Sequence, residues 1–127
     1  MKLFDSTLGI HGKALSVRSQ RMEILSQNIA NADTPNFKAQ DLDFRAALKG
    51  VQSSSGIKTT HVGHIDAAEH IKPHVFFTKP LNASENGNTV EISVEQAKYG
   101  RAAAEYQATL RFLEGDISAI RKVLRGD

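Results

Sequence analysis

Apolar residues in the first part of the chain repeat with the period of a long helix. Between residues 8 and 32 a 3,4 spacing selects eight positions, and six of them are apolar, with His11 and Arg18 as the exceptions. A second row, which includes Ile10, Val17 and Ile24, repeats every seven residues about 160° around the helix from the first. Because one neighbour cannot cover both rows, the pattern predicts a helix within residues 1–33 that packs on two sides.

Residues 90–127 carry a second and more regular helical pattern. A 4,3 spacing selects ten positions, all apolar or aromatic except Gln96, which is typical of a coiled-coil seam about five heptads long. Basic side chains in the last turns and Gly126 after them favour a helix end there. We call the following apolar positions of the two helices the seam and expect them to be shielded in an assembly: Leu8, Leu15, Met22, Leu25, Ile29, Ile92, Tyr99, Ala103, Tyr106, Leu110, Leu113, Ile117, Ile120 and Leu124.

Residues 34–89 form an irregular middle segment. Thr34 precedes Pro35 and is therefore pushed out of the helical region, which ends the first helix. Residues 41–49 predict a short helix with an aspartate cap and Gly50 after it. We expect residues 51–60 to be a flexible linker and residues 61–88 an extended loop with one β-prone run at 74–78. The three segments are expected to form one structural unit.

The lengths of the two helices predict an elongated molecule. At ~1.5 Å per residue, helices of roughly 28 and 36 residues would be about 42 and 54 Å long, whereas a compact domain of this size is about 36 Å across. A first helix that is apolar on two sides, next to a polar middle, leaves too little core to cover what it exposes. We therefore expect copies of the chain or other partners to complete it.

Composition and charge argue against several classes of function for this chain. The chain has 127 residues and a net charge of +2, with basic residues dispersed along it, which argues against nucleic-acid binding. It has no cysteine, so disulfides, thiolate metal sites and cysteine nucleophiles are excluded. Its apolar runs fall far short of the ~18 residues of a membrane helix, and no apolar stretch follows Lys2 as in a secretory signal. We expect neither membrane insertion nor a cleavable signal peptide.

Four histidines, His61, His64, His70 and His74, raise the question of a metal site. His70 and His74 have the i, i+4 spacing that places two imidazoles on one helix face. Pro73 interrupts that helix, however, and the glutamate of a zinc-binding helix motif is absent. We interpret the cluster as solvated loop histidines and assign no metal ligand.

Catalytic motifs give no positive signal either. The chain has no nucleophile elbow, phosphate-binding loop or dinucleotide-binding turn. Asp41 and Asp43 lie at a helix start, where capping explains them, and Tyr99 and Tyr106 have the spacing of packing residues. We predict no catalytic residue, no cofactor and no enzymatic activity.

Residues 28–39 have the sequence NIANADTPNFKA, which is more specific than the end of a helix requires. They resemble the N-terminal signature of bacterial flagellar axial proteins, the rod and hook family. Asn36 and Phe37 stand where Gly and Tyr are common, a mild departure because Asn tolerates the left-handed backbone. The signature residues are Asn28, Ile29, Ala30, Asn31, Asp33, Thr34, Pro35 and Phe37.

Two further segments narrow the resemblance within that family. The continuation over residues 38–44, the short length and residues 87–91 before the last helix look most like a proximal rod subunit. A sibling proximal rod protein is the nearest alternative, although its signature usually has extra residues before the aromatic. Hook and distal rod proteins carry larger middle domains, for which this chain has no room.

The resemblance implies a mainly α structural subunit whose terminal helices pair as a coiled-coil-like hairpin. Such subunits pack against copies of themselves and other rod proteins to build the periplasm-spanning drive shaft of the flagellum. The family also implies export through the flagellar type III apparatus, assembly in the periplasm, and contact with export-gate or ring components of the basal body. The alternative from another class is a helical-hairpin adaptor that binds a partner helix in a closed complex rather than a polymer.

Overall fold

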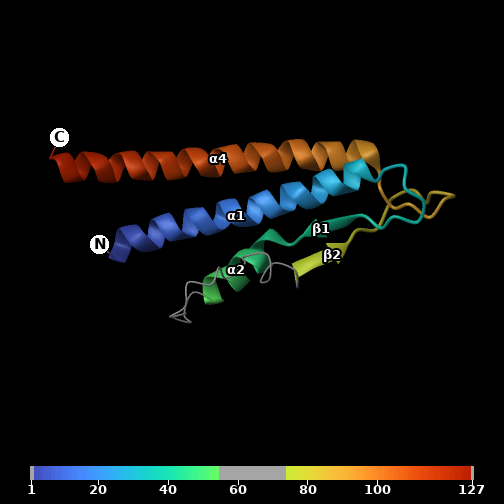
Figure 1. Ribbon diagram of the computed structural model, residues 1–127, viewed down its shortest axis with the longest axis horizontal. Coiled ribbons are helices and arrows are strands. Elements are labelled where there is room, and N and C mark those ends of the chain that lie inside the picture. Colours follow the sequence, from blue (N-terminus) through green and yellow to red (C-terminus); the bar gives the residue numbers. More distant parts are fainter. Residues whose placement is uncertain (1, 55–73, 127) are drawn as a thin grey trace.

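The computed structural model describes residues 2–54 and 74–126, and it is mainly helical (Figure 1). Two long antiparallel helices lie side by side with both chain termini at one end, which confirms the predicted pairing of the terminal helices. A short helix and a two-stranded sheet flank the N-terminal helix on the side away from the C-terminal one. The elements are α1 (Lys2–Ala30), β1 (Gln40–Leu42), α2 (Phe44–Ser54), β2 (Val75–Phe77) and α4 (Ile92–Arg125).

Helix α1 packs on two sides, as its two apolar rows predict. On one side Val17 is fully buried in a cluster with Leu42 of β1 and Ala47 and Val51 of α2. On the other side α1 runs along α4 (Figure 1), where Arg18 reaches the side chain of Thr109. Helix α1 therefore separates α4 from the small layer made by α2 and the sheet.

Helix α2 begins and ends later than the sequence predicts. It starts at Phe44 rather than near residue 41, because residues 40–42 form β1. Asp43 supplies the expected aspartate cap, since its Oδ1 accepts the N–H of Ala46 at 3.2 Å. The helix continues past Gly50 to Ser54, so the first four residues of the predicted linker are helical. Burial of Val51 against α1 explains the extension, while residues 55–60 of that linker lie outside the described residues.

The predicted β-prone run contains β2, which pairs with β1 in an antiparallel ladder. The register places Gln40 opposite Phe77, Asp41 opposite Phe76 and Leu42 opposite Val75. Strand β1 was not predicted, because three residues beside a strong helix cap carry no alternating pattern of their own. The sheet holds the middle segment against α1.

Helix α4 ends as predicted, at Gly126 in the left-handed conformation. Its φ is 75°, and its N–H donates to the carbonyl of Lys122 at 3.1 Å. Within residues 2–54 and 74–126, no helix is both long enough and apolar enough to cross a membrane.

The burial of Leu25 gives a direct test of where the core of the hairpin lies. Leu25 is 0% exposed, so Leu25→Ala should lower the free energy of unfolding by ~2–5 kcal/mol. Leu124 belongs to the same seam but is 75% exposed, so Leu124→Ala should change it by under about 0.5 kcal/mol. Urea denaturation of the two purified variants measures both values, and equal losses would contradict this core.

Candidate assembly site

The signature segment forms the turn by which the chain leaves α1. Past the end of the helix, the side-chain amide of Asn31 donates to the carbonyl of Gln27 at 2.8 Å. The hydroxyl of Thr34 donates to Oδ1 of Asn31 at 3.1 Å, which fixes the turn before Pro35. Asn36 has a φ of 60°, the left-handed conformation expected for the residue that replaces Gly in the signature.

A second loop, more than fifty residues later, binds this turn. We call residues 31–39 together with residues 84–90 the clasp. Main-chain bonds join its halves, since the N–H of Asn36 donates to the carbonyl of Asn86 at 2.9 Å and that of Thr89 to the carbonyl of Phe37 at 3.0 Å. The ammonium of Lys38 adds a bond to the carbonyl of Gly87 at 2.7 Å. The clasp thus joins the end of the signature segment to residues 87–91, a second segment of the family resemblance.

Asn88 closes the clasp by binding the free end of α1. Its side chain is buried, and its amide donates to the carbonyls of Asn31, Ala32 and Thr34 at 2.8–2.9 Å. These carbonyls lie just past the helix, where the helical ladder no longer supplies donors. The Oδ1 of Asn88 accepts the N–H of Val90 at 2.7 Å. One side chain therefore ties the end of α1 to the approach of α4.

Gly87 is required by the close approach of the two halves. Its φ of 74° is a conformation that L side chains rarely adopt. A Cβ at this position would also collide with Oδ1 of Asn36. A larger residue would force the two loops of the clasp apart.

Asn28 connects all three layers of the molecule from within α1. It is 1% exposed, and its amide group pairs with both backbone groups of Gln40, donating to O at 2.6 Å and accepting from N at 3.1 Å. The same Nδ2 donates to Oε2 of Glu95 on α4 at 2.9 Å. This bond and Lys98, whose Nζ lies 3.5 Å from Oε1, stabilise the buried carboxylate.

Two arginines of α1 extend this polar contact along the molecule. Arg18 donates to Thr109 at 3.0 Å and to Glu105 at 2.8 Å on α4, and its guanidinium lies 4.1 Å from the ring centre of Phe44 in α2. Arg21 makes two hydrogen bonds to the carboxylate of Asp41 at 2.9 and 3.2 Å. The hydrogen bonds to Asp41 raise the pKa of Arg21 and so favour its charged form.

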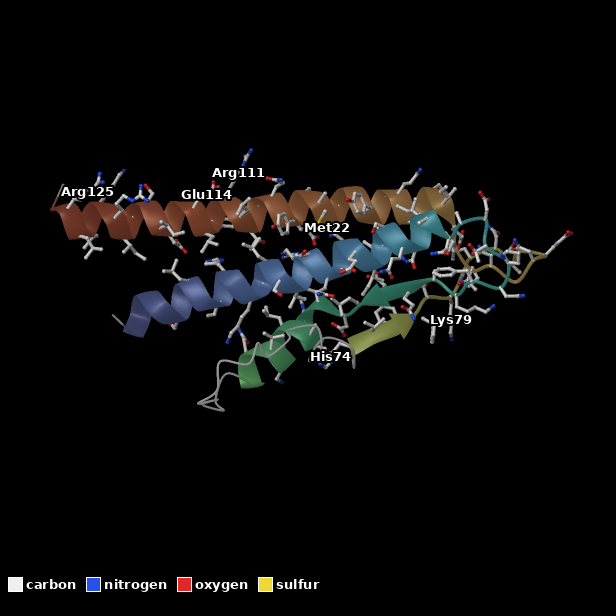
Figure 2. All side chains as sticks on the ribbon, viewed as in Figure 1. Met22, His74, Lys79, Arg111, Glu114 and Arg125 are labelled. Carbon is white, nitrogen blue, oxygen red and sulfur yellow. The ribbon has the colours of Figure 1, made fainter. Side chains whose placement is uncertain are left out.

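A third polar contact lies toward the termini. Nε2 of His11 lies 3.2 Å from Oδ2 of Asp116. The imidazole ring of His11 also stacks on the ring of Phe112, with centroids 6.4 Å apart. His11 and Arg18, the two polar exceptions in the first row, therefore both contact α4. Most side chains along the hairpin are drawn in Figure 2, where Met22 lies between the two long helices while Arg111 and Glu114 point away from α1.

Comparison with known proteins gives one consistent result. A family described as flagella basal body rod protein matches residues 8–38, which span most of α1 and the following turn. The flagellar basal body rod protein FlgB of Aeromonas hydrophila is 42% identical, over 98% of this chain and 96% of its own length. The chain belongs to the FlgB family. FlgB proteins of Yersinia enterocolitica and Escherichia coli K12 are 38% and 35% identical, each over 95% of this chain and 95% and 94% of their own lengths.

Membership in the family settles the main function. The chain is a structural subunit of the flagellar basal-body rod and serves bacterial motility. This conclusion is favoured over both the hairpin adaptor and the sibling rod protein that the signature left open. The clasp and the polar contacts are therefore features of a rod subunit.

The structure divides the seam of this rod subunit by burial. In α4 the buried residues are Glu95, Ala102 and Thr109, a row about 60° around the helix from the seam. Of the seam residues, Leu25 is buried. Half-buried are Leu8, Leu15, Met22, Ile29, Ala103, Tyr106, Leu110, Leu113 and Ile120, whereas Ile92, Tyr99, Ile117 and Leu124 are exposed.

The buried polar residues of the hairpin were not predicted from the sequence. Glu95 and Thr109 lie seven residues either side of Ala102, a heptad spacing that a search for apolar positions passes over. The polar exceptions His11 and Arg18 in the apolar row of α1 were the available signal. Asn88 belongs to residues 87–91, which carry part of the family resemblance, but nothing local indicates that it binds a helix end.

Most of the histidines considered for a metal site lie outside the residues that the structure describes. Of the four clustered histidines, the structure describes His74, which immediately precedes β2, while His61, His64 and His70 are not among the described residues. Within the described ranges no three metal-binding side chains gather in one place.

Substitution at Gly87 should weaken the clasp. Gly87→Ala imposes a strained φ and a collision with Asn36, so we expect a loss of about 1–3 kcal/mol in the free energy of unfolding. Gly100 lies in α4 with open space at its Cβ position, and Gly100→Ala should instead stabilise the chain by ~0.5–1 kcal/mol. Urea denaturation measures both changes in the free energy of unfolding. Changes of opposite sign support the clasp, whereas no loss of stability in Gly87→Ala argues against it.

Asn88 should be sensitive even to an isosteric change. Asn88→Asp replaces the donor that faces three carbonyls with a second acceptor, so stability should fall by about 2–4 kcal/mol. Asn82 is exposed in the adjoining loop, so Asn82→Asp is the matched control and should change stability by under about 0.5 kcal/mol. Thermal unfolding of both variants at neutral pH gives their midpoint temperatures. Equal midpoint temperatures would contradict the role assigned to the Asn88 amide.

Proposed function

We propose that the subunit polymerises through the seam, with the clasped hairpin as its rigid unit. The observation that supports this is the rotation of the seam away from the buried row of α4. A helix that needed to cover only α1 would place its apolar residues on the buried row. In α4 the buried row holds Glu95 and Thr109, while apolar Ile117 and Leu124 remain exposed.

The exposed part of the seam runs along most of α4. Exposed or half-exposed apolar and aromatic residues recur from Ile92 through Tyr99 and Ile117 to Leu124. A row of exposed and half-buried apolar side chains of this kind is typical of a protein–protein contact. We assign it to neighbouring rod subunits, both copies of this chain and other rod proteins.

The clasp and the polar contacts prepare that surface by fixing how α1 and α4 lie against each other. Paired hydrogen bonds such as those of Arg18 and Asn28 have one geometry, whereas apolar side chains accept several. A slip of one turn would break these bonds together. The half-buried α1 residues of the seam therefore keep a fixed position relative to its exposed α4 residues, with residues 1–33 and 90–127 as the assembling helices and residues 34–89 as their connection.

Membership in the rod family supports a proposal for how this subunit reaches the basal body. We propose that it is exported through the flagellar type III apparatus without a cleavable signal peptide and assembles in the periplasm. There it contacts other rod proteins and the export-gate and ring components of the basal body. Its role in that position is mechanical, and it needs no catalytic residue or cofactor.

Exposed seam residues allow assembly to be tested separately from folding. Ile117→Lys places a charge on the seam without removing a buried side chain, so the isolated chain should keep its stability within about 0.5 kcal/mol. Rod assembly should fail, because the charge would be buried without a partner. Electron microscopy of purified basal bodies and a soft-agar motility assay measure the result.

The neighbouring residue provides the control for that experiment. Ser118 is exposed one position further, on another face of α4, so Ser118→Lys adds the same charge outside the seam. We expect rods and motility to be retained in this variant. Rods of normal length with Ile117→Lys would overturn the assignment of the seam, and closed complexes of fixed size in place of rods would favour the adaptor.

A further inference from the structure

The β1–β2 ladder determines which backbone groups of the sheet face outward. The N–H of Asp43 donates to the carbonyl of His74 at 3.1 Å, immediately beyond the strands. Hydrogen-bonded pairs alternate in an antiparallel ladder, so Asp41 and Phe76, two positions along, form the next such pair. The residues on either side of this pair therefore turn their backbone groups away from the partner strand.

On β1 three of the four outward groups are bonded to side chains. Both backbone groups of Gln40 pair with the amide of Asn28 in α1. The N–H of Leu42 donates to Oδ1 of Asp41 at 2.7 Å. The β1 edge of the sheet is thus closed within the chain.

On β2 the outward groups belong to Val75 and Phe77. Among the described residues, no group accepts a hydrogen bond from either N–H. Strand β2 also lies on the far side of β1 from α1 (Figure 1), and Phe76 and Phe77 are 48% and 65% exposed. An open edge with exposed aromatic residues is a template for another strand.

We infer that this edge pairs with β2 of a second copy in antiparallel orientation. The outward groups of Val75 and Phe77 lie symmetrically about Phe76, so a two-fold axis at Phe76 places each Val75 opposite the partner's Phe77. Both Val75–Phe77 pairs then exchange N–H···O bonds. The two Phe76 rings meet in the closer, non-hydrogen-bonded pair, where aromatic residues stabilise a sheet.

The self-complementary register is the reason for choosing a second copy over a foreign strand. The same alignment places His74 opposite the partner's Thr78, so no like charges face each other along the strand. Lys79 lies beyond the paired residues. Pairing yields a four-stranded sheet whose two outer edges are the β1 edges already closed by Asn28 and Asp41.

This contact differs in kind from the contact proposed for the rod. A two-fold contact uses the same patch on both copies and closes on itself, so it cannot be the repeating contact of a polymer. It joins two subunits through β2 in opposite orientations and leaves the seam of each hairpin outside the contact. A paired subunit therefore separates from its partner before it enters a rod in which all hairpins point the same way. The pairing therefore stands or falls independently of the proposed polymerisation.

Because the natural chain has no cysteine, a single introduced thiol reports the register without ambiguity. In the purified chain, Phe76→Cys places two thiols opposite each other in the non-hydrogen-bonded pair, with Cβ atoms about 4.5–5.5 Å apart, and oxidation should link them. Leu81→Cys is the control, because Leu81 is 87% exposed but lies outside the pairing. We expect disulfide-linked dimers to form at least about tenfold faster with Phe76→Cys than with Leu81→Cys.

Proline at position 77 should abolish the contact while leaving the β1 ladder intact. The N–H of Phe77 faces outward, and proline is tolerated at such an edge position. Adding Phe77→Pro to the Phe76→Cys variant should reduce the rate of cross-linking to that of Leu81→Cys. Sedimentation velocity of the unmodified chain should show a dimer that grows with concentration, and Phe77→Pro should leave monomer.

A charge variant covers the case in which Phe77→Pro disturbs the fold. Phe76→Lys places like charges opposite each other at the two-fold axis and should remove the dimer, whereas Ile117→Lys on the seam should retain it. Equal cross-linking at positions 76 and 81, a monomer at every concentration, or a dimer that survives Phe76→Lys would each overturn the inference.

Discussion

The arrangement of this subunit depends on one buried amide, that of Asn28. A helix and a strand edge usually have no way to share hydrogen bonds, because the backbone groups of a helix are already paired. Asn28 solves this by presenting a peptide-like group to Gln40, so that α1 takes the place of a neighbouring strand. Since the same nitrogen also binds Glu95, the position of the sheet and the position of α4 are set at one point on α1.

The elements that sequence analysis predicted are those whose cause is local or periodic. Helices α1 and α4 follow from apolar residues at helical spacing, and the end of α4 follows from Gly126. The two apolar rows of α1 also predicted packing on two sides. The extension of α2 past Gly50 was missed, because it depends on the burial of Val51 against a helix that lies far away in the sequence.

The clasp shows the limit of the same approach at the candidate site. Its first half belongs to the signature and its second half to residues 87–91 of the family resemblance, but their contact depends on Asn88, which lies more than fifty residues from the carbonyls it binds. Likewise, Glu95 and Thr109 resemble solvent-exposed positions until Asn28 and Arg18 are placed opposite them. A single sequence does not indicate which distant residues form such hydrogen-bonded pairs, because the residues adjacent to each of them in the sequence give no sign of the partner.

The two ends of the hairpin are chemically unlike. One end is closed by the hydrogen bonds of the clasp, and the other carries both chain termini beside the exposed basic residues Arg121, Lys122 and Arg125. A filament in which such hairpins share one orientation has a direction, with every clasp facing the same way. Its opposite tips then present different surfaces, so a subunit that fits one tip has no equivalent site at the other.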